Sequence, residues 1–191
     1  RLLHHAFVSS VRRFPRRKAI ADATIPHMSY VKTLIASLMF ARKLKDMVGD
    51  TPMVGVLLPP TVGAALTNIA LMFMGKIPIN LNYTASREYI ESAVKQCGIT
   101  HILTAHKFLE KFPVEFPGEA VYLEDVRSRI KPVDKIAAML MAATSAISKS
   151  SMATMEPNRK LLKLALPETN PDSTPARPMP ADMMMAMDIS W

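Results

Sequence analysis

The most constraining feature of this sequence is an apolar run that is too short for a helix and shows no polar alternation. Residues Met53–Leu58 read Met-Val-Gly-Val-Leu-Leu, and Pro59-Pro60 ends the segment. A strand without polar alternation is buried on both faces, as the strands of a parallel sheet are. The run therefore predicts a central strand in an α/β fold whose sheet is covered on both faces.

The segments around this run alternate between helical and strand patterns. Ser29 is the expected N-cap and Gly49 the expected end of a helix whose apolar residues recur every three or four positions. Thr61 similarly opens a helix that ends before Gly75, and Ser86 opens one that ends at Gly98. The remaining predicted elements are strands over 19–22, 77–81, 100–104 and 120–123 and a short helix over 107–111.

Strands and helices that alternate at this spacing predict βαβ units and a three-layer α/β fold, with a parallel sheet and flanking helices. Each crossover is expected to be right-handed. The expected sheet core consists of Val54, Val56, Leu58, Ile77, Ile79, Ile102 and Leu103.

The character of the chain changes after about Lys131, which suggests three parts. Residues 1–131 are the predicted α/β part, residues 132–150 an apolar helix, and residues 151–191 a linker rich in Pro and Met. The apolar run Ile136–Ile147 is shorter than the ~20 residues of a membrane-spanning helix. It has no polar face, so we expect another surface to cover it, with protein favoured over an anionic membrane.

Charge is concentrated at one end. Six basic residues and no acidic residue lie in residues 1–20, out of a net charge of +8. This segment is either a solvated basic stretch before the first strand, a contact for an anionic surface, or a targeting sequence. Because residue 1 is Arg, we expect the chain to be a processed or excised part of a longer one. The single Cys97 cannot form an internal disulfide and favours a reducing compartment.

The sequence contains no recognisable catalytic, cofactor-binding or metal-binding motif. Gly75-Lys76 resembles the end of a Walker loop, but Ile77 replaces the required Ser or Thr. His101 and His106 lack the spacing of zinc ligands and are interpreted as surface or packing residues. Aromatic residues make up 6% and do not alternate with basic ones, so no nucleic-acid partner is expected.

Two stretches carry more specific information than the periodicity. The first is Met28-Ser29-Tyr30 with the later Ala41-Arg42-Lys43-Leu44, and the second is Val54–Pro60 with Ala70–Thr84. Together they resemble the adenylate-forming (AMP-binding) superfamily of acyl-CoA synthetases, luciferases and peptide-synthetase adenylation domains. The variant Gly75-Lys76-Ile77-Pro78-Ile79-Asn80-Leu81-Asn82-Tyr83-Thr84, with Gln96-Cys97-Gly98-Ile99, resembles the acyl–acyl-carrier-protein synthetase / 2-acylglycerophosphoethanolamine acyltransferase branch. Thr33 stands where the family usually has Leu.

The resemblance covers about residues 5–125 and implies an incomplete N-terminal subdomain of an adenylate-forming enzyme. The family's Gly-rich phosphate loop is expected after Trp191, so the chain alone is expected to bind no ATP and to be inactive. Asn80, Asn82 and Tyr83 are the residues that the resemblance places beside the substrate. For the full-length enzyme it implies ATP and Mg²⁺ as cofactors. Its implied partners are a fatty acid, an acyl carrier protein and the missing C-terminal catalytic part.

Two classes of function are compatible with these features. The first is the N-terminal part of an acyl-activating ligase in fatty-acid and phospholipid metabolism. Its expected location is cytoplasmic, with peripheral contact at the inner membrane left open. The second is a non-catalytic α/β binding or scaffold module. The coding sequence after Trp191 distinguishes them, because a Gly-rich Ser/Thr loop ending in Lys-Gly supports the ligase, whereas a stop codon supports the module or a broken gene.

Overall fold

The computed structural model describes residues 3–147, so the predicted linker over 151–191 lies outside the described residues. The elements in chain order are α1 (Leu3–Arg13), β1 (Lys18–Ile20), β2 (Met28–Ser29), α2 (Tyr30–Val48), β3 (Met53–Val56), α3 (Val62–Phe73), β4 (Ile77–Asn80), α4 (Arg87–Cys97), β5 (His101–Thr104), α5 (His106–Lys111), β6 (Glu119–Tyr122), α6 (Leu123–Ser128) and α7 (Pro132–Ile147).

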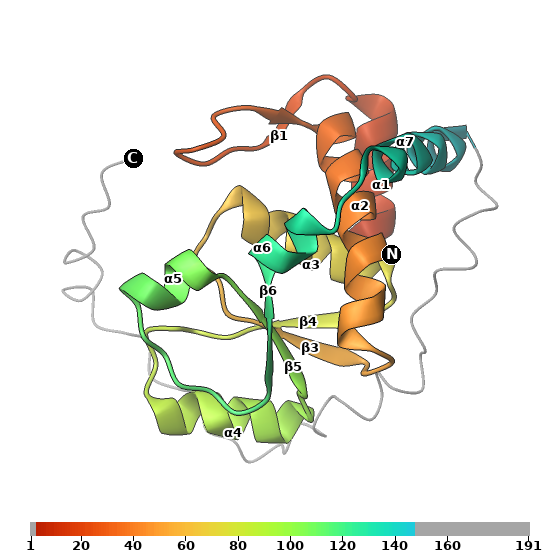
Figure 1. Cartoon of the computed structure of the whole chain (residues 1–191). Coiled ribbons are helices and arrows are strands. Elements are labelled where there is room, and N and C mark those ends of the chain that lie inside the picture. Colours follow the sequence, from red (N-terminus) through yellow and green to blue (C-terminus); the bar gives the residue numbers. More distant parts are fainter. Residues whose placement is uncertain (1–2, 148–191) are drawn as a thin grey trace, which may run out of the picture.

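Four strands form a parallel sheet in the order β4-β3-β5-β6. The chain runs from β3 to β4 on one side and then returns past β3 to β5 and β6 on the other. In Figure 1, α4 lies on one face of this sheet, and α2, α3 and α6 lie on the opposite face. The predicted three-layer α/β fold is confirmed.

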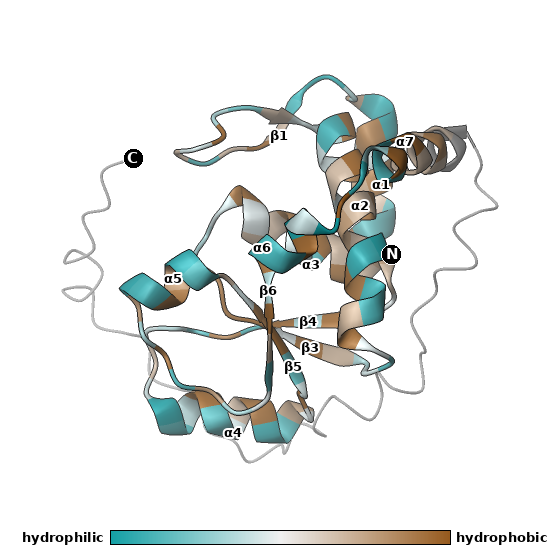
Figure 2. Cartoon of the chain, viewed as in Figure 1, coloured by the Kyte–Doolittle hydropathy of each residue, from teal (hydrophilic) through white to brown (hydrophobic). Residues whose placement is uncertain are grey.

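The two faces of the sheet have separate cores. Val54, Val56 and Leu103 pack with α2, α3 and α6, whereas Leu57 and Ile102 pack with α4 and α5. Figure 2 shows hydrophobic colouring where the strands meet and also on α3 and α7, while much of α4 is hydrophilic. The central strands are thus buried on both faces, as the unbroken apolar run predicts.

The burial of the expected core is less complete than predicted at one edge. Leu58, Ile77 and Ile79 are only half-buried. Leu58 lies beyond the end of β3, and the other two belong to β4, which is an edge strand of the sheet within residues 3–147. Pro78 in this strand suits an edge position, because proline cannot donate to a neighbouring strand.

The predicted helix ends agree with the structure. Ser29 is the N-cap of α2, and Thr61 caps α3 by accepting a hydrogen bond from the Ala64 N–H at 3.3 Å. Gly98 ends α4 in the left-handed conformation, with a φ of 59°. Thr33 is fully buried and donates its hydroxyl to the Ser29 carbonyl at 2.9 Å, so its polar group is satisfied where the resembled family has Leu.

Three elements are absent from the sequence-based prediction. Helix α1 occupies most of the segment interpreted as a solvated basic stretch, and it buries His4, Val8 and Val11. The basic residues Arg13, Arg16, Arg17 and Lys18 are exposed, as a solvated basic stretch predicts, but the helix itself was not predicted. Strand β2 pairs antiparallel with β1, and the short α6 follows β6 directly. The apolar positions of α1 alternate with His and Arg, which hides its buried face in the sequence.

Helix α7 packs on α1 and α2 through small residues. Ala138 and Ala142 are 0% and 5% exposed, respectively, and belong to the same core as Leu34 and Leu38. Four other bulky side chains of the helix face outward and are 48–65% exposed: Val133, Ile136, Met139 and Leu140. No helix within residues 3–147 is long and apolar enough to cross a membrane.

Asp134 anchors the first turn of α7. Its carboxylate lies 2.8 Å from the Lys43 Nζ, 3.9 Å from the Arg42 Nε, and accepts the Lys131 N–H at 2.8 Å. The hydrogen bond from Lys43 is the main cause of a lowered pKa at Asp134. This ion pair joins residues 91 positions apart in the sequence, and the apolar periodicity of α7 does not predict it.

Candidate functional site

The sheet topology singles out one edge. The connection after β3 leads to β4 on one side, and the connection after β5 leads to β6 on the other. In open parallel sheets, ligands bind outside the carboxyl ends of the strands where the connections diverge in this way. The segments at this edge include residues 57–61 after β3, 81–86 after β4 and 105–106 after β5.

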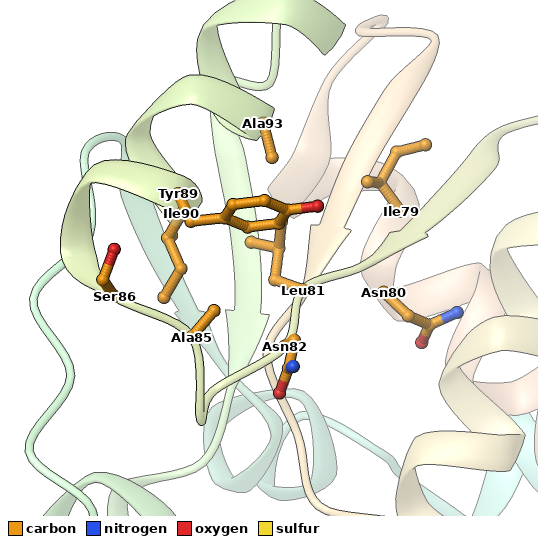
Figure 3. A pocket seen from close by; sticks show the side chains of 9 residues that line it. All are labelled: Ile79, Asn80, Leu81, Asn82, Ala85, Ser86, Tyr89, Ile90 and Ala93. Carbon is orange, nitrogen blue, oxygen red and sulfur yellow. The ribbon is translucent and has the colours of Figure 1, made fainter. Parts of the chain in front are cut away.

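A cleft of about 530 Å³ opens between the end of β4 and helix α4. Leu81 and Ile90, which are 6% and 1% exposed, form its floor. Figure 3 shows the Tyr89 ring extending across the cleft above Leu81, with its hydroxyl directed toward Ile79. The other lining residues are Asn80, Asn82, Ala85, Ser86 and Ala93.

Asn80 and Asn82, which the resemblance places beside the substrate, both line this cleft. The Asn80 Oδ1 accepts a hydrogen bond from the Asn68 Nδ2 at 3.0 Å. The Asn82 Oδ1 accepts from the backbone N–H and the hydroxyl of Thr84 at 3.0 and 2.8 Å. Both side chains are exposed and held in place, although contact of either residue with a substrate stays a prediction.

Tyr83 is placed differently from the two asparagines. Its ring packs against Phe108 and Phe112, at centroid distances of 5.1 and 5.6 Å. It does not line the cleft of Figure 3 but a neighbouring hollow that also includes Arg87 and Pro113. Through these ring contacts, Tyr83 packs the loop after β4 against α5.

Tyr89 is the residue of the cleft that the sequence-based search missed. It is 69% exposed. Its position was recoverable, because the helix that follows a strand in a βαβ unit begins at the carboxyl edge. With Ser86 predicted as the N-cap, Tyr89 falls in the first turn of that helix.

Two histidines lie at opposite ends of β5. The His101 Nδ1 lies 2.8 Å from the Thr100 Oγ1, and the His101 Nε2 lies 3.5 Å from a Glu119 oxygen. His106 stacks on Tyr122 with a centroid distance of 3.6 Å. Among residues 3–147 there is no group of three His, Cys, Asp or Glu side chains that could hold a metal ion. Both histidines make packing and surface contacts, as predicted.

Asp22 closes the amino end of α3, which lies at the same edge. Its carboxylate accepts the Val62 N–H at 2.8 Å and the Thr24 and Ile25 N–H groups at 2.9 and 2.6 Å. The hydrogen bond from Val62 is the main reason that the pKa of Asp22 is lowered. A helix amino end attracts anions. Here a carboxylate of the chain itself fills that position.

Gly75-Lys76 lies between a helix and a strand, which is the reverse order of a Walker loop. The Lys76 ammonium donates to the Gly49 and Thr51 carbonyl oxygens at 2.7 and 2.6 Å. Burial lowers the pKa of Lys76. The lysine thus ties the loop after α2 to the start of β4.

The cleft is suited to binding rather than to acid–base chemistry. None of the residues that line it is an Asp, Glu, His, Lys or Cys. The amides, the phenol and the apolar floor can contact a ligand that combines an apolar part with hydrogen-bonding groups.

The sequence matches no protein-family model. Solved structures nevertheless share the fold. The N-terminal subdomain of Klebsiella oxytoca NpsA superimposes with a TM-score of 0.59 at 14% identity, over 68% of this chain and 33% of that one. NpsA in complex with 3-hydroxyanthranilyl-AMSN gives 0.57 at 16% identity, over 67% and 26%. The nonribosomal peptide synthetase FmoA3, in its alpha-methyl-L-serine-AMP bound form, gives 0.56 at 14% identity, over 69% and 15%.

These likenesses show that the chain shares its α/β fold with part of the NpsA N-terminal subdomain. The chain spans about a third of the length of the NpsA subdomain that it matches. The resemblance noted from Met28–Tyr30 and Gly75–Thr84 predicted the same architecture.

Proposed function

We propose that this chain is the N-terminal part of an adenylate-forming enzyme that activates a carboxylic acid. The fold carries this proposal, because its structural neighbours are N-terminal subdomains of adenylation domains. The Gly75–Thr84 motif adds an independent argument, since it forms β4 and the loop beside the cleft.

In the proposed whole protein, ATP with Mg²⁺ would supply the adenylate that makes the acyl carbonyl reactive toward a thiol. Two neighbours were solved with 3-hydroxyanthranilyl-AMSN and alpha-methyl-L-serine-AMP, which supports a nucleotide-linked acyl group as the ligand class. The described residues contribute the sheet, the cleft and the Asp22-capped helix. The groups that handle phosphate are proposed to belong to the C-terminal catalytic part.

A fatty acid and an acyl carrier protein are the proposed substrate and acceptor. The Gly75–Thr84 variant supports this assignment through its resemblance to acyl–acyl-carrier-protein synthetases. An artificial fusion of NpsA with ThdA forms an adenylation–PCP di-domain, which is compatible with a carrier-protein partner. We propose that the substrate lies beside Asn80 and Asn82, and that Tyr83 holds their loop through Phe108 and Phe112.

The division into residues 1–131, 132–150 and 151–191 stays part of the proposal, as does a cytoplasmic location. We propose that the catalytic part, rather than a membrane, covers the outer side of α7. The exposed residues there are apolar, with Lys135 as a neighbouring charge, whereas a helix lying in a membrane interface has a strongly polar face.

ATP–pyrophosphate exchange on the whole protein, expressed from its complete coding sequence, tests the proposal. Exchange is expected with a fatty acid and not with amino acids or aryl acids. The 191-residue chain alone should show none. Exchange with an amino acid would contradict the fatty-acid assignment. A coding sequence that stops at Trp191, or exchange by the 191-residue chain alone, would contradict the proposal as a whole.

Tyr89→Ala tests the cleft in the same assay. The variant should raise the KM for the acid by up to roughly tenfold and leave kcat unchanged, because an aromatic contact contributes about 0.5–1.5 kcal/mol to binding. Lys95→Ala is the matched control, since Lys95 is exposed on the same helix but does not line the cleft. Equal KM values for the two variants would exclude Tyr89 from the substrate site.

A further inference from the structure

A second cleft, of about 480 Å³, opens at the opposite end of the sheet from the candidate site. It lies where α2 and α3 end, beside the residues that lead into β3 and β4, and α7 closes one side. We call it the amino-edge cleft, lined chiefly by Leu38, Arg42, Lys45, Phe73, Lys76 and Met141. Its volume is in the range of small-molecule sites, about 300–1,000 Å³.

The walls of the amino-edge cleft are apolar and well packed. Leu38 and Phe73 are 3% and 6% exposed and belong to the core shared by α1, α2, α3 and α7. Met141 packs against the same core from α7. A methionine wall can adjust to ligands of different shape, because its side chain is unbranched and flexible.

The rim of the cleft is cationic. Arg42, Lys45 and Lys76 contribute three positive charges, against one carboxylate from Asp50. Asp134 pairs mainly with Lys43, whose Nζ lies 2.8 Å from its carboxylate. The Arg42 Nε lies 3.9 Å from the same carboxylate, so this contact neutralises Arg42 less closely. Lys45 is exposed, and no ion pair of Lys45 is present within residues 3–147.

The Lys76 ammonium is held in a fixed position in this rim. Two backbone carbonyls hold its ammonium at 2.6–2.7 Å, and an ammonium has a third hydrogen to donate. A positioned cation loses little further freedom when it binds an anion, which favours binding. The apolar walls meet this cationic rim within one cavity.

We propose that the amino-edge cleft binds a small amphipathic anion. Its carboxylate, or a comparable anionic head, contacts Lys76, Arg42 and Lys45, and its apolar body lies against Leu38, Phe73 and Met141. This site is separate from the cleft beside Tyr89 and does not depend on the proposed enzyme activity.

Octanoate titrated into the 191-residue chain, followed by amide ¹H–¹⁵N shifts, tests this site. Saturable shifts are expected at Phe73, Gly75 and Lys76, and binding should weaken as salt is added, because salt screens exposed charges. Octylammonium has the same chain and the opposite charge, so it should not bind there. Equal binding of octylammonium, or shifts confined to Ile136 and Met139, would overturn the proposal.

The charge variant Arg42→Gln/Lys45→Gln should weaken octanoate binding roughly tenfold, since each exposed ion pair contributes at most a few-fold. Lys45→Gln alone should weaken it by a smaller factor and leaves the Asp134 ion pairs intact. Lys135→Gln, which removes an exposed charge from α7 outside the cleft, serves as the matched control. Octanoate affinity that is the same in all three variants would refute the cationic rim.

Discussion

Gly55 in β3 offers a sharp test of the packing between the sheet and α4. A Cβ atom at this position would lie 2.9 Å from the Ile102 Cγ1 and 3.3 Å from both the Ile99 Cγ2 and the Leu81 Cδ1. Its φ is not in the left-handed region, so Gly55→Ala introduces a steric clash without straining the backbone. Ile102 is fully buried, and its Cγ1 moves only if the whole side chain rotates into packed neighbours.

The sign of the effect follows from two opposing terms. Overpacking costs typically about 1–3 kcal/mol, whereas removing a glycine from a strand gains about 0.5–1 kcal/mol. Gly55→Ala should therefore destabilise the fold by about 1–2 kcal/mol. With a urea m-value of about 1–3 kcal/mol/M, the unfolding midpoint should fall by roughly 0.3–2 M.

Two further variants make this reasoning refutable. Gly63→Ala in α3 is the matched control, because its Cβ would meet atoms no closer than 3.6 Å, and it should raise the midpoint. In an Ile102→Ala background, Gly55→Ala should become neutral or stabilising, since the clashing atom is gone. A midpoint that rises in Gly55→Ala, or the same loss in both backgrounds, would refute the steric argument.

Three other substitutions probe polar groups by urea unfolding. Asp22→Asn weakens the acceptor of the Val62 N–H and should cost about 0.5–1 kcal/mol near pH 7. Because the pKa of Asp22 is lowered, this difference should vanish as pH falls through the folded-state value. Burial is the main cause of a lowered pKa at His4, and the charge of His5 lowers it further. The free energy of unfolding should therefore decrease as the pH drops below about 6.5, and His4→Gln should flatten that pH dependence. Ser37→Ala should stabilise by about 1 kcal/mol, because the buried Ser37 hydroxyl has no hydrogen-bond partner within residues 3–147; an unchanged midpoint would contradict this.

Local chemistry made the central sheet and the helix ends predictable from sequence. The run Met53–Leu58 has no polar position, which is typical of a strand covered on both faces, and its first four residues form β3. Thr61 and Gly98 marked helix ends because a hydroxyl acceptor and a left-handed glycine satisfy groups that every helix end exposes. These signals depend on near neighbours in the chain, which is why they were sufficient.

Contacts between distant residues account for what the sequence did not reveal. Asp22 reaches Val62 across 40 positions, and Lys43 reaches Asp134 across 91, yet each residue looks like ordinary surface charge in its own segment. The buried side of helix α1 is likewise not evident from its own residues, because contacts with α2 and the distant α7 define it. For the candidate site, the resemblance proposes Asn80, Asn82 and Tyr83 as substrate-adjacent, which stays a prediction, whereas the cleft and Tyr89 emerged from the fold.

The two edges of the sheet differ in their capacity to accept another strand. On β4, the N–H groups of Ile77 and Leu81 donate to the β3 side, so residue 78 faces outward, and Pro78 offers no donor there. On β6, the Glu119 N–H donates to the Thr100 carbonyl, so the N–H groups of Ala120 and Tyr122 face outward with no proline among them. An added strand finds an uninterrupted row of donors at β6 and a gap at β4. Within residues 3–147, the β4 edge therefore lacks an outward donor at Pro78, whereas the β6 edge keeps those of Ala120 and Tyr122.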